Sequence, residues 1–193
     1  MSVNTVKRGG QAGLLAAALF LITTVIDQIA PFTTVYDSPR DYVNPTLNLL
    51  AFLAAARGVV GFWALQSRAG RFRRLGAVGA GMTGVGYTVF ALLNAASITQ
   101  GELSLVRVRV VAATVMLIGS AILGFIVLRT HLLPWWCGVL LIGAFPLGDV
   151  ANELFRGAEG VLLALLWGSV GLALLARSPT SAGQFATPAS RLS

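Results

Sequence analysis

Three polar side chains stand at helical spacing late in the chain: Asp149, Asn152 and Glu153. Residues at positions i, i+3 and i+4 share one face of an α-helix, so these groups would form a polar stripe. Two carboxyl groups on one face could act as a general acid and base. Pro146 removes a backbone hydrogen bond in the same apolar run, which predicts a kink or a local opening; a simple packing kink is the alternative.

Arg57 lies within the apolar run 47–65, which is long enough to cross a membrane. An ionised side chain near mid-bilayer costs at least about 2.5–3.5 kcal/mol, so Arg57 needs a partner or a water-filled cavity. With a rise of about 1.5 Å per residue, Asp149 and Asp27 would lie about 5–10 Å nearer the outer surface, within reach of arginine. We expect Arg57 to pair with Asp149 first and with Asp27 second. The alternatives are a purely structural ion pair and a side chain that extends to an interface.

Further polar residues fall in the outer halves of other apolar runs. They include Gln28 in the first run, Asn48 in the second and Asn94 in the third. Tyr87 occupies the position equivalent to Asp149 in an internal repeat described below. Together these groups could enclose a polar recess that opens to the outside. Its expected lining residues are Asp27, Arg57, Tyr87, Asn94, Asp149, Asn152 and Glu153.

The elements that must position these groups are apolar helices. The 193 residues are 56% hydrophobic and 11% charged, far below the roughly 25% charged residues of soluble domains, which excludes a soluble protein. Apolar segments of about 20 residues match the roughly 30 Å hydrocarbon core and recur six times. We therefore predict an all-α fold, a polytopic transmembrane bundle of six helices. Their expected ranges are 12–31, 46–65, 75–97, 108–128, 135–155 and 159–176.

These segments leave almost no chain for a separate soluble domain. We divide the protein into a cytoplasmic N-terminus, 1–11, a transmembrane domain, 12–176, and a flexible cytoplasmic tail, 177–193. The basic start followed by an apolar run could be a secretory signal. We expect a retained helix instead, because no convincing small-x-small cleavage site precedes Pro31.

The formal charge of +7 is divided among short segments between the helices, which indicates membrane topology and not a nucleic-acid partner. The positive-inside rule places both termini in the cytoplasm and all seven acidic residues in outer loops or outer helix halves. The basic loop 68–74 could also bind anionic headgroups, at about 1 kcal/mol per cationic residue, or could set orientation only.

Glycines suggest a parallel repeat of helix pairs 2–3 and 4–5. Those at 76, 81 and 86 align with those at 138, 143 and 148 at an offset of about 62 residues. Both copies would share one orientation, as in parallel-repeat carriers; chance similarity of glycine-rich helices is the alternative. Small residues allow close helix packing, so we expect the third helix at the centre of the bundle, with a dimerisation face as the other interpretation.

The remaining reactive residue types argue against a cofactor or an enzyme. His131 is the only histidine and Cys137 the only cysteine, which excludes an internal disulfide and bis-histidine haem ligation. No dinucleotide or P-loop fingerprint is present. We expect no cofactor, no metal and no catalytic residue.

The stretch 128–138, which follows Gly124-Phe125, resembles turns in uncharacterised small six-helix integral membrane proteins of high-GC bacteria. The resemblance covers one turn, transfers no functional residue and implies a multi-pass protein of the bacterial plasma (inner) membrane. One lysine among 14 basic residues agrees with such a genome.

Three classes of function remain. The first is a membrane-embedded interaction or accessory protein, indicated by the glycine surfaces and short loops. The second is a small-solute carrier or binding protein with an outward-facing recess around Arg57 and Asp149. The third, an intramembrane enzyme, has the least support. The expected partners are the lipid bilayer, a protein partner or second copy, and a small solute, with no nucleic acid.

Overall fold

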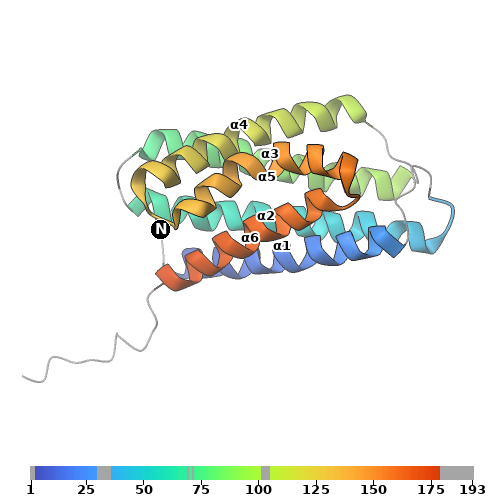
Figure 1. Cartoon of the computed structure of the whole chain (residues 1–193), viewed down its shortest axis with the longest axis horizontal. Helices are drawn as coiled ribbons and strands as arrows, with labels where there is room; N and C mark the ends of the chain where they lie inside the picture. The colour runs from blue at the N-terminus through green and yellow to red at the C-terminus, as the bar shows by residue number, and fades with distance from the viewer. Residues whose placement is uncertain (1–2, 30–35, 69, 71, 101–104, 179–193) are drawn as a thin grey trace, which may run out of the picture.

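A computed structural model describes residues 3–29, 36–68, 70, 72–100 and 105–178. All regular structure in the described part of the chain is helical (Figure 1). The expected tail, 177–193, and the end of the expected first segment therefore lie largely outside the described residues. The helices are α1 Val3–Ile29, α2 Val43–Arg68, α3 Arg73–Gln100, α4 Val106–Thr130, α5 Trp135–Leu154 and α6 Ala158–Arg177, with a 3-10 turn η1, Pro39–Tyr42, before α2.

All six α-helices are long and apolar enough to span a membrane. The prediction of six apolar spans is thus confirmed, and the chain has the architecture of a multi-pass membrane protein. The helices extend beyond the apolar segments because backbone hydrogen bonding continues into the flanking polar residues. Helix α1, for example, begins at Val3 and includes the basic start, and α5 continues through Pro146 without a break.

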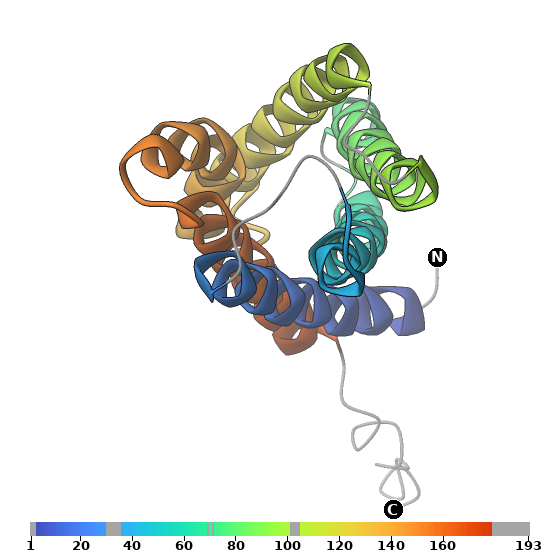
Figure 2. The same cartoon turned by 90° about the vertical axis from the view of Figure 1, so that its right-hand side faces the viewer.

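The six helices form a closed ring. Each helix packs against its neighbours in sequence, and α1 packs against α6 to close the circle (Figure 2). Successive helices run antiparallel, so the helical part of the chain starts and finishes at the same end of the bundle. We call the opposite end the acidic end, and the end where the chain starts the basic end. The acidic end is formed by Ile29, Val43, Gln100, Val106, Leu154 and Ala158.

The predicted central position of the third helix is wrong. Helix α3 lies in the ring between α2 and α4, because a closed ring has no central helix. Its glycines divide between two faces. A Cβ atom at Gly86 would lie 2.5 Å from the Met116 Cβ, whereas one at Gly81 would meet nothing within 4 Å. Gly81 therefore faces outward, away from the neighbouring helices.

Close glycine contacts hold the basic half of the ring together. A Cβ atom at Gly61 of α2 would lie 2.5 Å from the Gly9 Cα of α1, and one at Gly124 of α4 would lie 2.6 Å from the Gly138 carbonyl oxygen of α5. Backbones can approach this closely only where no side chain intervenes. Gly61 and Gly124 are equivalent in the predicted repeat, yet they meet different partners. The repeat of helix pairs stays a prediction.

Candidate functional site

A cavity of about 340 Å³ lies at the acidic end of the ring. Side chains from all six helices line it, and we call it the recess. Because the helix ends surround this space in a circle (Figure 2), residues far apart in sequence reach it together. The polar lining includes Asp27 of α1, Asn48 of α2, Asn94 of α3, Arg109 of α4, Asn152 of α5 and Glu159 of α6.

Phenylalanine rings form the deep wall of the recess. Phe52 stacks on Phe90 with ring centroids 5.2 Å apart, and Phe20 meets Phe52 edge to face at 5.4 Å. Such offset and edge-to-face pairs are favourable arrangements of aromatic rings. The polar groups of the recess therefore stand above an apolar surface.

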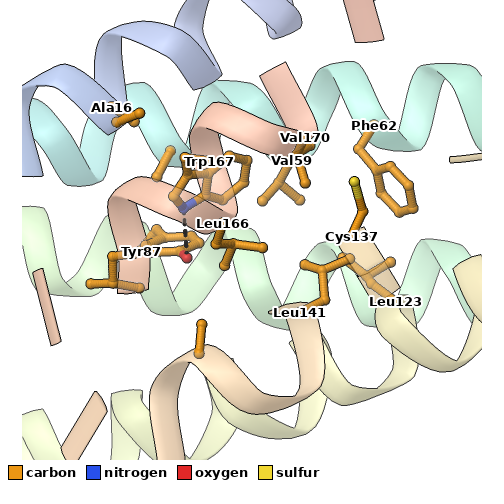
Figure 3. Close-up of a cluster of buried hydrophobic side chains, with 14 of the residues drawn as sticks. Ala16, Val59, Phe62, Tyr87, Leu123, Cys137, Leu141, Leu166, Trp167 and Val170 are labelled. Atoms are coloured by element: carbon orange, nitrogen blue, oxygen red, sulfur yellow. Dashed lines mark hydrogen bonds between the residues drawn. The ribbon is translucent and has the colours of Figure 1, made fainter. Parts of the chain in front are cut away.

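Tyr87 and Trp167 lie one layer deeper. The Trp167 indole N–H donates a 2.9 Å hydrogen bond to the Tyr87 hydroxyl, across the ring from α6 to α3 (Figure 3). Both side chains are buried, and the Tyr87 ring contacts Phe52 at 6.0 Å. This aromatic pair separates the recess from the apolar core of the basic half, where Figure 3 shows Phe62, Leu123 and Cys137.

Amide and hydroxyl groups line the sides of the recess. The Asn48 amide donates to the Asn44 side-chain oxygen at 3.3 Å, and the Asn94 amide donates to the Phe90 carbonyl at 2.8 Å. Thr24 donates its hydroxyl to the Phe20 carbonyl at 2.8 Å. Each amide also has a second N–H and a side-chain oxygen, so Asn48 and Asn94 bring both donors and acceptors to the recess.

Arg109 supplies the positive charge of the recess. It lies in the first turn of α4, is partly buried, and donates a 3.1 Å hydrogen bond to the Ser97 hydroxyl of α3. Its Nε atom is buried and has no partner among the described residues. Tyr36 lies beside it in the segment before α2: burial raises the pKa of the Tyr36 phenol, and the Arg109 charge partly opposes that rise.

Glu159 supplies a carboxyl group in the first turn of α6. A carboxylate at a helix N-terminus interacts favourably with the helix dipole. A Cβ atom at Gly148 of α5 would lie 3.0 Å from the Glu159 Cγ, so this side chain packs directly on the α5 backbone. Asn152 of α5 accepts a 2.6 Å hydrogen bond from the backbone N–H of Gly157, which precedes α6 with a φ of 83°. These contacts fix the wall on which Glu159 stands.

The structure gathers only part of the predicted site. Asp27, Asn94 and Asn152 line the recess, as does Asn48. Tyr87 lies beneath it and reaches it through Phe52. Asp149 and Glu153 are exposed and do not line the cavity, since the inward face of α5 carries Gly148 and Asn152.

Arg57 also lies outside the recess. It is exposed on the outer face of α2, with Leu53 and Val60 one turn away on either side. Within the described residues, no ion pair joins Arg57 to Asp149, so their expected pairing is not present. The position of a residue along its helix does not determine which way its side chain points.

The sequence reasoning did not assign Arg109 and Glu159 to the site. Both stand at the very start of an apolar segment, where charged residues are common topology signals. One signal in the sequence could have identified them. Each residue lies in the first turn of its predicted helix, so its side chain projects from the helix itself and not from the preceding loop. Among the described residues, no group of three His, Cys, Asp or Glu side chains gathers as metal ligands.

No protein-family model, curated protein or solved structure matches this chain. The geometry of the recess is therefore the basis for a functional proposal.

Proposed function

We propose that this protein binds a small polar solute in the recess, as a membrane carrier or a membrane-embedded binding protein. The observation that carries the proposal is a single cavity of about 340 Å³ to which all six helices contribute. Binding sites for small molecules are typically clefts of about 300–1,000 Å³ with apolar walls and a few placed polar groups. The recess has this composition, with a phenylalanine floor and polar residues above it.

The distribution of charge supports an outward orientation of the recess. Lys7, Arg8, Arg68, Arg73 and Arg74 all lie at or near the basic end, opposite the recess. By the positive-inside rule, the basic end would face the cytoplasm of a bacterial cell. Both termini are then cytoplasmic, and the recess opens outside the plasma membrane.

The layer beneath the recess bears on the choice between a carrier and a static binding protein. The buried Tyr87–Trp167 pair blocks the route from the recess to the basic end, and a carrier must open it during transport. In this interpretation, the structure represents an outward-open state. The predicted parallel repeat would supply the two halves that move, as in parallel-repeat carriers.

Cysteine accessibility tests the proposal. Asn94→Cys and Asn152→Cys are placed singly in a Cys137→Ala background, because Cys137 is buried and is the only cysteine. A membrane-impermeant maleimide added to intact cells is expected to label both positions. Tyr87→Cys, one layer deeper, should remain unlabelled.

Two control positions define full labelling and no labelling. Asp37→Cys, exposed before η1, should label fully, and Leu53→Cys on the outer face of α2 should not label. If Asp37→Cys reacts while neither asparagine position does, the recess is dry and the proposal fails. If Asp37→Cys does not react either, the acidic end faces the cytoplasm and the outward orientation is wrong. Labelling of Asp37→Cys, Asn94→Cys and Asn152→Cys from outside would also establish the orientation.

A second candidate function, a membrane-embedded interaction protein, is favoured by a different surface. Gly81 of α3 faces open space, and Gly84 has only the Val59 side chain at 4.0 Å from its Cβ position. Small residues allow another transmembrane helix to approach closely. Arg57 is exposed on the outer face of neighbouring α2, where a partner carboxyl group would reduce the cost of a charge in lipid.

Cross-linking distinguishes this candidate. Gly81→Cys should cross-link to a copy or partner in native membranes, and Leu117→Cys, on the exposed face of α4, serves as the matched control. Equal cross-linking at both positions would indicate random collision and would remove the support for an interface. Neither proposal requires a bond to be made or broken in the recess. An intramembrane enzyme stays the third alternative, which Asp149 and Glu153 would have to support from outside the cavity.

A further inference from the structure

We propose that the solute is a small amino carboxylate, bound as a zwitterion across the recess. Its carboxylate would bind Arg109, and its ammonium group would lie near Asp27 and Glu159 on the far wall. This inference rests on the proposed binding function and specifies the chemical class of the solute.

The separation of charge across the recess is the first argument. In a closed ring of six helices, α4 stands opposite α1, and α6 is the neighbour of α1. Arg109 of α4 therefore lies on one wall, while Asp27 of α1 and Glu159 of α6 lie on the opposite side. A solute that spans the recess meets a cation at one end and carboxyl groups at the other.

The hydrogen-bonding state of Arg109 is the second argument. One terminal nitrogen of the guanidinium donates to Ser97, but the buried Nε has no partner among the described residues. A buried donor without an acceptor is unfavourable, so the guanidinium is incompletely satisfied where it stands, and a solute carboxylate would satisfy it by drawing the Arg109 side chain toward the recess. The planar guanidinium offers donors in a fork that fits a carboxylate, which a single neutral acceptor would not use fully.

The opposite wall favours a cationic group. Two carboxyl groups line the recess against one guanidinium, so an anion alone would be repelled at the α1–α6 side. Thr24 of α1 also lines the recess and points at the α6 backbone, where a Cβ at Gly160 would contact its hydroxyl. An ammonium group has three donors, which suits a wall made of carboxyl and hydroxyl oxygens.

The middle of the recess limits the size and character of the solute. Phe20, Phe52 and Phe90 form an apolar floor, which suits an aliphatic or aromatic side chain between the two charged ends. The volume of about 340 Å³ accommodates a solute of amino-acid size. A dicarboxylate would place its second carboxylate on the side of Glu159, and a diamine would place an ammonium group beside Arg109.

The experiment compares each amino acid with two analogues that lack one charge. The purified full chain in nanodiscs is titrated with a panel of apolar amino acids, the matching N-acetyl amino acids, and the matching decarboxylated amines. Binding is measured as protection of Asn152→Cys from maleimide and, for the wild-type chain, as an increase in the unfolding temperature. At least one amino acid is expected to bind about tenfold or more tightly than both of its analogues.

Two pairs of variants locate the charged ends. Arg109→Gln is expected to raise the Kd of the amino acid about tenfold and to affect the amine less, while Arg107→Gln, exposed on the same helix, leaves the Kd unchanged. Glu159→Gln should raise the Kd of the amino acid and change the Kd of the N-acetyl analogue less. Its matched control is Glu153→Gln, at an exposed position.

The possible outcomes separate this inference from the proposed function. If Asn94→Cys and Asn152→Cys label from outside but no amino acid binds, or the single-charge analogues bind equally well, the zwitterion assignment is overturned while a wet recess remains. If neither position labels, the proposed function fails first. The comparison of analogues uses the wild-type chain, so it tests the zwitterion assignment even if Arg109→Gln does not fold.

Discussion

The two halves of the helical bundle differ in what fills the space between the helices. Toward the acidic end the ring encloses a polar recess above three phenylalanine rings. Toward the basic end the helices meet through glycines such as Gly61 and Gly124, and apolar side chains fill the interior. The contrast shows how one ring of six helices can be firmly packed and still contain a cavity. Close glycine contacts occur in both halves, including Gly160 with Thr24 at the acidic end, but in the basic half apolar side chains also fill the interior.

The basic half is nevertheless not entirely apolar. Gln66 is 1% exposed, and neither its amide nitrogen nor its carbonyl oxygen has a hydrogen-bond partner among the described residues. Its side chain packs against Gly76, where any Cβ atom would collide with it. The polar groups of the recess are largely hydrogen-bonded or open to the cavity, so Gln66 is the clearer cost to stability.

The largest expected effect comes from breaking the glycine contacts of the basic half. In Gly61→Val, the new Cβ would lie 2.5 Å from the Gly9 Cα, and backbone atoms cannot move aside without separating α1 from α2. We expect a loss of about 3 kcal/mol or more in unfolding free energy, measured by thermal unfolding in detergent. Gly81→Ala, which faces open space, should be neutral; similar losses in both variants would contradict the proposed packing.

The second-largest loss of stability is expected at the Tyr87–Trp167 pair, which lies at the boundary between the two halves. Tyr87→Phe removes the acceptor of the Trp167 indole N–H and leaves a buried donor unsatisfied, with an expected loss of about 1–3 kcal/mol. The unfolding free energy of Tyr87→Phe is compared with that of the control Tyr42→Phe. The Tyr42 hydroxyl donates only a long, weak hydrogen bond of 3.4 Å to the Tyr36 carbonyl oxygen, so its loss should cost little. An unchanged Tyr87→Phe protein would mean that water reaches this layer.

A smaller effect, of opposite sign, is expected at Gln66. Gln66→Met replaces two unpartnered polar atoms with an apolar chain of similar length, and we expect a gain of about 1 kcal/mol in unfolding free energy. Gln11→Met, exposed on α1, is the matched control and should change stability little. If Gln66→Met destabilises the protein, the amide has a role that packing does not explain.

The smallest effect on the isolated protein is expected at Arg57. Arg57→Leu removes an exposed side chain without disturbing either half, so the unfolding free energy should stay within about 0.5 kcal/mol of the original value. A large loss would show that Arg57 has an internal partner after all. If the interaction candidate is correct, the same variant should weaken cross-linking at Gly81→Cys.

The comparison also shows which residues were predictable. Asp27, Asn48, Asn94 and Asn152 were assigned to an outer recess from their depth in apolar segments, and all four line the cavity. Arg57 was assigned from depth as well, yet it faces outward.

The same limit applies to the other charged residues. Asp149 and Glu153 share a helical face that turns away from the recess, while Arg109 and Glu159 reach it from the first turns of their helices. Ordinary amphipathic helices show their buried face in the sequence. These helices are apolar on nearly all sides, so no such pattern was available to orient them.

The sequence by itself determined the helical class and the six apolar spans, because the thickness of the hydrocarbon core requires about 20 apolar residues per crossing. Only the tertiary structure decided the rotation of each helix about its axis, the position of α3 in the ring and the residues that share the recess. Those properties arise from contacts such as Gly9 with Gly61 and Tyr87 with Trp167, between side chains and backbones distant in sequence. In lipid, where every outward face is equally apolar, close packing among neighbouring helices selects the rotation.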